Sequence, residues 1–140
     1  MAVFSLKYRD TRPLLRVVLH DPAPDGSAPG TVGPVHDLAG STSWKLHILL
    51  SDGTAISRDL FKVGTDAQGE LGYDWVGGDW DSGGLVVGPS LPLTPGVREH
   101  RMEYEVLGPG GARLTFPNGG TSAGEAYDTL RVWQDIGQGA

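Results

Sequence analysis

Hydrophobic and polar residues alternate in short runs along this chain, and glycine, proline and aspartate separate the runs. The clearest run covers residues 43–50, where Trp44, Leu46 and Ile48 share one face and polar side chains share the other. Alternation with a period of two is typical of a β-strand with one buried face. Further strands are predicted at residues 4–8, 15–20, 55–60, 71–75, 98–107, 113–116 and 127–133. No stretch shows a convincing helical period, so we expect an all-β fold.

Turn-forming residues set the spacing of these strands. An Asp-Gly pair at residues 52–53 and a Gly-Pro-Gly-Gly run at residues 108–111 each predict a hairpin. Turn signals recur roughly every 8–12 residues, which is typical of β-sandwiches. A chain of 140 residues fits one domain. We therefore expect a single antiparallel β-sandwich of about seven to nine strands over residues 1–140.

Two segments do not fit a regular strand. Residues 21–34 contain four prolines and three glycines, which predicts an extended loop about twice the usual length. Such a loop is either a mobile tether or a segment that a partner orders. Residues 84–97 are apolar but contain three prolines, so much of this segment must be edge or loop. The glycine-rich end from Gln134 is predicted to be a short flexible tail.

Composition removes several classes of function. The chain has no cysteine, which excludes disulfide scaffolds, thiolate metal sites and cysteine nucleophiles. Its net charge is −6, and its eleven Lys and Arg residues are scattered, so we expect no nucleic-acid partner. No run approaches the roughly 20 apolar residues of a membrane span, and the first ten residues lack the pattern of a signal peptide. We expect no membrane association and no secretion by that route.

The stretch at residues 69–84 combines a predicted strand with a turn rich in glycine and aspartate. Asp74, Asp79 and Asp81, with Trp75 and Trp80, could bind calcium or a sugar, because hard cations take clustered carboxylates and sugars stack on indole rings. The alternative is that the aspartates cap a tight turn by bonding their own backbone while Trp75 fills the core. The spacing of an EF-hand is absent, which favours the alternative.

Catalytic and metal-binding patterns are not found. Glu103 and Glu105 alternate along one strand face, which is typical of a solvated sheet surface rather than of a glycosidase pair. Ser41, Ser43 and Ser51 have no nucleophile-elbow context. The histidines lack metal-ligand spacing; they are His20, His36, His47 and His100. We therefore expect no enzymatic activity, no cofactor and no resident metal.

The apolar segment at residues 84–97 is the stronger candidate for function. Its hydrophobic side chains cannot all reach a core that the strands already supply, and an exposed apolar patch usually marks an interface. We predict contacts to neighbouring subunits through Leu85, Val86, Val87, Leu91 and Leu93, together with the loop at residues 21–34. The alternative is an arm folded back over the edge of its own sheet.

Several pieces of the chain resemble, in the same order, the immunoglobulin-like N-terminal domain family of phage upper baseplate proteins. An Arg-Asp-Thr element precedes an apolar strand, an Asp-Leu-Ala-Gly-Ser element precedes another, a Gly-Asp turn follows an aromatic strand, and a hairpin ends in Thr-Phe-Pro. These pieces lie at residues 8–19, 37–42, 69–83 and 104–117. The segment at residues 84–97 is inserted relative to that pattern, and the loop at residues 21–34 is longer.

The resemblance implies an immunoglobulin-like sandwich that is a structural part of a tailed-phage virion, at the tail tip, baseplate or neck. It implies assembly in the host cytoplasm, contacts with other virion proteins and a homo-oligomer around a symmetry axis. One alternative is a small carbohydrate-binding sandwich for host adhesion, with Trp75, Trp80 or Trp133 as a stacking platform. Another is a decoration protein on the capsid surface.

Overall fold

The computed structural model describes residues 3–7, 14–28, 31–50, 53–76, 79, 97–116 and 128–133. Two short 3-10 turns, η1 (Asp66–Gln68) and η3 (Pro109–Gly111), accompany the strands of this part of the chain. The all-β prediction is confirmed. The strands are β1 (Val3–Lys7), β2 (Leu15–Val18), β3 (Ser43–Leu49), β4 (Ala55–Asp59), β5 (Phe61–Val63), β6 (Glu70–Tyr73), β7 (Val97–Leu107), β8 (Arg113–Phe116) and β9 (Asp128–Trp133).

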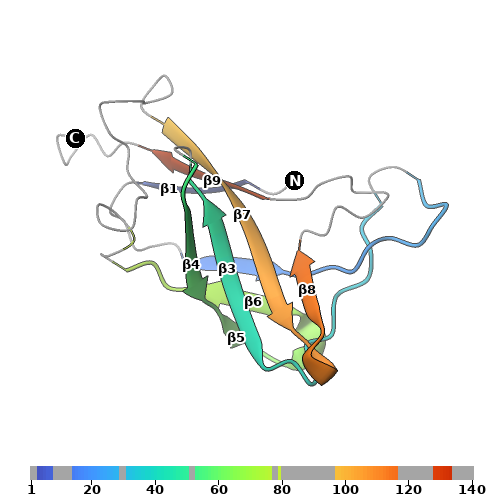
Figure 1. The fold of residues 1–140 in the computed structure, drawn as a ribbon. Helices are drawn as coiled ribbons and strands as arrows, with labels where there is room; N and C mark the ends of the chain where they lie inside the picture. Colours follow the sequence, from blue (N-terminus) through green and yellow to red (C-terminus); the bar gives the residue numbers. More distant parts are fainter. Residues whose placement is uncertain are drawn as a thin grey trace.

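The strands form two sheets that face each other (Figure 1). The larger sheet has the order β1-β9-β7-β3-β4, and β8 adds to it by pairing with β7. The smaller sheet has the order β2-β6-β5. Both the chain order and the sheet order of these strands match an immunoglobulin domain. The smaller sheet, β2-β6-β5, corresponds to strands B, E and D. The part β9-β7-β3-β4 of the larger sheet corresponds to strands G, F, C and C′. The predicted immunoglobulin-like sandwich is therefore confirmed.

The long strand β7 organises the larger sheet. One of its edges pairs with β3, and its other edge pairs first with β9 and then with β8. The predicted hairpins also form, since β3 pairs with β4 and β7 pairs with β8, all in antiparallel register. The predicted antiparallel sandwich is confirmed, and one pair departs from the antiparallel direction, because β1 runs parallel to β9. Periodicity reveals strands but not their direction, which depends on the path of the chain between them.

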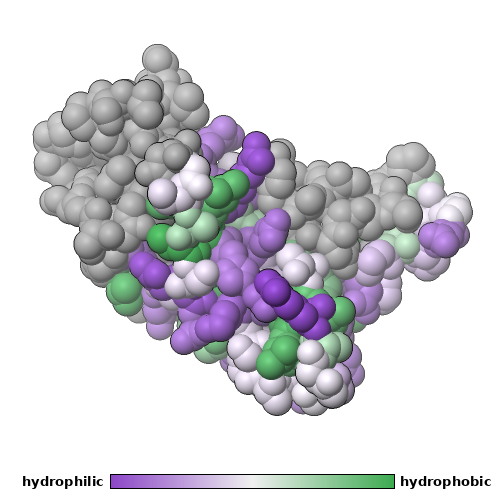
Figure 2. Space-filling view, in the orientation of Figure 1, coloured by the Kyte–Doolittle hydropathy of each residue, from purple (hydrophilic) through white to green (hydrophobic). Residues whose placement is uncertain are grey.

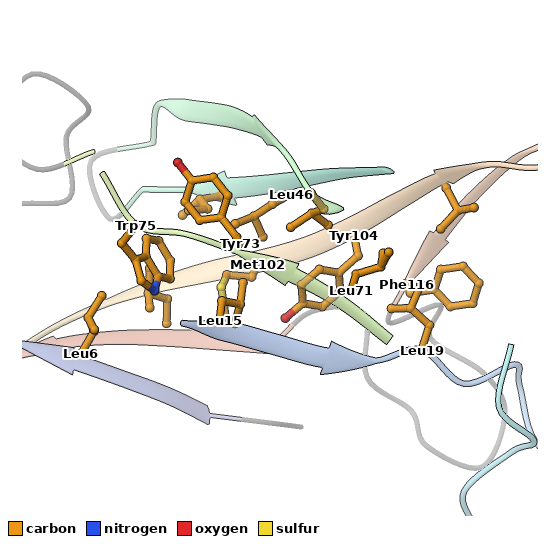
Figure 3. Close-up of a cluster of buried hydrophobic side chains, with 14 of the residues drawn as sticks. Leu6, Leu15, Leu19, Leu46, Leu71, Tyr73, Trp75, Met102, Tyr104 and Phe116 are labelled. Carbon is orange, nitrogen blue, oxygen red and sulfur yellow. The ribbon is translucent and has the colours of Figure 1, made fainter. Parts of the chain in front are cut away.

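The core lies between the two sheets (Figure 3). The inward side chains of β3 and β6 are buried as their alternation predicts, with Leu46, Ile48 and Leu71 at 0% exposure. Trp75 is 3% exposed, and its ring lies edge-on to that of Tyr73 with centroids 5.2 Å apart. The buried cluster consists of Leu6, Leu15, Leu19, Leu38, Leu46, Ile48, Leu50, Leu60, Leu71, Tyr73, Trp75, Met102, Tyr104, Val106, Phe116, Leu130 and Val132.

The outer face of the larger sheet carries the polar half of each alternation, and Figure 2 shows hydrophilic side chains gathered over its centre. Cross-strand ion pairs cover this face. Lys45 on β3 donates to Asp59 on β4 at 2.7 Å, and Arg131 on β9 donates to Glu99 on β7 at 2.6 Å. These charged side chains are thus paired across neighbouring strands.

Candidate functional site

Asp79, predicted as a possible calcium or sugar ligand, is fully buried at 0% exposure. Its Oδ1 accepts from Arg58 Nε at 2.7 Å and its Oδ2 accepts from the Val76 backbone N–H at 2.9 Å. The Tyr73 hydroxyl lies 3.0 Å from one carboxylate oxygen and 2.8 Å from the other. The Asp79 backbone N–H donates to the Val76 carbonyl at 2.9 Å, which closes the turn after β6. We call Asp79, Arg58 and Tyr73 the buried network.

The buried network is a structural clamp. Burial, and then the neighbouring Asp79 carboxylate, raise the pKa of Tyr73 far above its ordinary value, so its hydroxyl stays a donor. The hydrogen bond to Asp79 raises the pKa of Arg58. Asp79 therefore caps a turn, as the alternative interpretation predicted. Asp81 and Trp80 lie outside the described residues, so the calcium or sugar site stays a prediction. Within the described ranges, no cluster of three or more acidic, histidine or cysteine side chains could hold a metal ion.

The tryptophans considered as a stacking platform for a sugar differ in how far they are buried. Trp75 packs in the core against Tyr73 and Phe4, which confirms the interpretation that it fills the core and rules out the alternative that it stacks on a sugar. The alternation along its strand predicted burial correctly, whereas the neighbouring aspartates suggested a ligand site. Trp133 is half-buried on the outward face of β9. Trp80 lies outside the described residues.

The loop at residues 21–34, which we call the arm, has a tightly held neck. The Asp21 backbone N–H donates to the Pro34 carbonyl at 2.8 Å, and the His36 N–H donates to the Leu19 carbonyl at 2.9 Å. The side chains repeat the closure, because His36 Nδ1 lies 2.8 Å from Asp21 Oδ1. A Cβ on Gly33 would lie 1.8 Å from the Asp21 carbonyl oxygen, so the neck needs glycine there.

Beyond its neck the arm extends away from both sheets, at the right of Figure 1. Its described residues, 21–28 and 31–34, contain two local turns. The Ser27 hydroxyl donates to the Pro24 carbonyl, and the Thr31 hydroxyl donates to the Ala28 carbonyl, each at 2.6 Å. Val32 is 70% exposed, the highest value among the large hydrophobic residues of the described chain. The arm therefore has internal order and presents an apolar side chain to its surroundings.

The predicted interface in the inserted segment cannot be placed. Leu85, Val86, Val87, Leu91 and Leu93 all lie outside the described residues. The last residue of the predicted loop at residues 84–97 does belong to a strand, because β7 begins at Val97.

A second polar cluster on the outer face of the larger sheet escaped the sequence analysis. His47 Nδ1 lies 2.7 Å from Ser57 Oγ, and His47 Nε2 lies 2.6 Å from Glu105 Oε1. Arg113 Nε lies 2.8 Å from the other Glu105 oxygen. We call Ser57, His47, Glu105 and Arg113 the surface network. Outward alternation marked His47 and Glu105 as surface residues, but it gave no sign that they meet.

Comparison with known proteins identifies no relative. No protein-family model matches the chain, and neither a curated protein nor a solved structure is significantly similar to it. Among the described residues, no helix has the length and apolar character needed to cross a membrane.

Proposed function

We propose that this domain is a structural component of a tailed-phage virion and that it acts through protein–protein contacts made by the arm. The observation that carries the proposal is the locked neck of the arm together with the exposure of Val32. The order of the motifs that resemble the upper baseplate family supports the same role.

The neck matters because ordering a loop on binding costs free energy. Each side chain that binding immobilises costs about 0.5–1.5 kcal/mol, and a loop held beforehand avoids part of that cost. Two backbone hydrogen bonds and the Asp21–His36 pair hold the base of the arm before any partner arrives. A preorganised arm with an apolar residue is suited to insertion into a neighbouring subunit.

The neighbour in this proposal is another virion protein or a second copy of the chain around a symmetry axis. Particles of the phage that encodes the chain should contain it, and mass spectrometry of gradient-purified particles measures this. Absence of the chain from wild-type particles would contradict the virion role.

A paired substitution tests the arm. Val32→Asp should remove the chain from purified particles, because a charge would have to be buried at the contact. Val3→Asp is the matched control, since Val3 is 46% exposed and belongs to β1, an end strand of the larger sheet that does not lead into the arm. Thermal melting of the isolated domain should be similar for both variants. Normal incorporation of the Val32→Asp chain would show that the arm is not the contact.

A further inference from the structure

Three side chains from three neighbouring strands meet on the outer face of the larger sheet. Ser57 belongs to β4, His47 to β3 and Glu105 to β7, and these strands lie side by side (Figure 1). The imidazole bridges the other two, with Nδ1 2.7 Å from Ser57 Oγ and Nε2 2.6 Å from Glu105 Oε1. A serine, a base and an acid are thus joined in the order that activates a serine nucleophile, with Nδ1 rather than Nε2 facing the serine.

Glu105 sets the direction of both hydrogen bonds. The bond from His47 lowers the pKa of Glu105, and Arg113 acts in the same direction, so this carboxyl is an acceptor. His47 must then carry its proton on Nε2 in order to donate to Glu105. In the neutral ring this leaves Nδ1 as an acceptor, and the Ser57 hydroxyl donates to it. The serine proton therefore already points at the base that would remove it.

A hollow lies beside the imidazole. It has a volume of about 250 Å³ and is lined by His47, Ile48, Leu49, Ala55, Arg101 and Glu103. Ala55 is two residues before Ser57 and so lies on the same face of β4. The apolar walls at Leu49 and Ala55 suit a small acyl group. A substrate in the hollow would lie against His47, and it would contact the face of β4 that carries Ala55 and Ser57.

The position of Ser57 on β4 also supplies a backbone donor. The Leu60 N–H donates to the Trp44 carbonyl, and the Leu50 N–H donates to the Thr54 carbonyl. The backbone N–H and C=O groups of the even-numbered residues of β4 therefore point toward β3. The N–H of Ser57 therefore points away from β3. Among the described strands, β4 pairs only with β3. This N–H can bind the oxyanion formed at Ser57, because the N–H of the nucleophile is part of the oxyanion hole in serine proteases.

We propose that Ser57 is an activated nucleophile that accepts an acyl group from small carboxylic esters held in the hollow beside His47. The Ser57 oxygen attacks the ester carbonyl while its proton passes to His47 Nδ1. The ester C–O bond then breaks, and the alcohol leaves with that proton. Water, deprotonated by His47, hydrolyses the acyl-serine and returns the enzyme to its starting state. Glu105 is a positioning residue that holds the ring and stabilises the imidazolium. This activity goes beyond the proposed assembly role and does not depend on it.

Covalent labelling provides the direct test. The intact chain is incubated with a fluorophosphonate, whose fluoride the Ser57 oxygen would displace, and the adduct is mapped by peptide mass spectrometry. We expect one label, on Ser57, and none in Ser57→Ala. His47→Gln should slow labelling by about a hundredfold or more, which is the usual contribution of a general base. Ser43→Ala is the matched control, because Ser43 lies on β3 and on the same outward face as His47; it should label like the wild type.

Hydrolysis of p-nitrophenyl acetate separates the role of Glu105 from a structural one. Glu105→Gln should lower kcat by about tenfold or more with KM unchanged, because it removes the charge that stabilises the imidazolium. Its melting temperature, and that of His47→Gln, should fall only slightly below that of the wild type, since both side chains are partly exposed and lie outside the core. Failure to label Ser57, equal labelling of His47→Gln and wild type, or a label spread over several residues would each overturn the proposal.

Discussion

Ser57 and Arg58 are neighbours on β4, yet they belong to opposite sides of the sheet and to two different polar networks. Arg58 joins Asp79 and Tyr73 in the buried network, whereas Ser57 joins His47 and Glu105 in the surface network. Alternation along a strand accounts for the separation. The buried network stabilises the fold, whereas the surface network is available for reaction, and the surroundings of each network make the difference.

Burial makes the difference between the two. Asp79 is 0% exposed, and fixed donors within the domain hold both of its oxygens. In the surface network the Glu105 side chain is 19% exposed, and the chain of bonds ends at the exposed Ser57 hydroxyl. A carboxylate enclosed by donors stabilises the fold. A chain of hydrogen bonds that ends at an exposed hydroxyl can bring that hydroxyl into contact with a substrate.

Arg58 connects the two networks. Its Nε donates to Asp79, and its Nη1 donates to the Ser57 carbonyl at 2.9 Å. That carbonyl points to the outer edge of β4, where an exposed edge could pair with another chain. Arg58 therefore both anchors the turn after β6 and covers an acceptor on the sheet edge, which disfavours edge-to-edge association.

The largest effect should come from removing the centre of the buried network. Asp79→Ala leaves Arg58 Nε, the Tyr73 hydroxyl and the Val76 N–H without their acceptor, and we expect the free energy of unfolding to fall by about 3–5 kcal/mol. Urea denaturation measures the change. The control is Asp59→Ala on β4, whose side chain is 83% exposed and which should leave the unfolding midpoint nearly unchanged. Similar midpoints for the two variants would refute the distinction between clamp and surface pair.

An intermediate effect is expected at Tyr73. Tyr73→Phe removes one donor to Asp79 but keeps the buried ring, so the free energy of unfolding should fall by about 1.5–3 kcal/mol, the usual range for a hydrogen bond to a charged group. In Asp79→Ala the same substitution should cost much less, because the partner is already lost. A double-mutant cycle in urea measures this coupling, and simple additivity would argue against a shared network.

The smallest effect is expected in the surface network, and it should depend on pH. His47 lowers the pKa of Glu105 below its ordinary value of 4.5, so the folded carboxyl binds its proton less tightly than the unfolded one. The stability that Glu105 contributes is therefore complete above pH 4.5 and is lost as the pH falls through the lower folded value.

Glu105→Gln should accordingly flatten the loss of stability as the pH falls below 4.5, measured by urea unfolding. The matched control is Glu103→Gln, which removes a charge from the next outward position of β7 but leaves the Glu105–His47 contact in place. A steeper acid loss in Glu105→Gln than in the wild type would reverse the assigned direction of the pKa change.

The local architecture of the domain follows from patterns within short stretches of the chain. Period-two alternation placed Leu46, Ile48 and Leu71 in the core, and Asp-Gly and Gly-Pro-Gly-Gly runs predicted both hairpins. The sequence also predicted the arm and a turn-capping role for Asp79 as one of two alternatives. These features depend on residues within a few positions of one another, where side-chain direction and turn chemistry act directly.

The contacts between polar groups depend on how distant parts of the chain pack together. Ser57 lies 10 residues from His47, and Glu105 lies 58 residues from it, so no local pattern links them. Arg58 and Asp79 are separated by 21 residues in the sequence, and β1 pairs with β9 although the two strands lie near opposite ends of the chain. Periodicity gives the face of each side chain but neither the order of the strands nor their register. Packing of the two sheets fixes that order and register, because it must bury all the apolar faces at once.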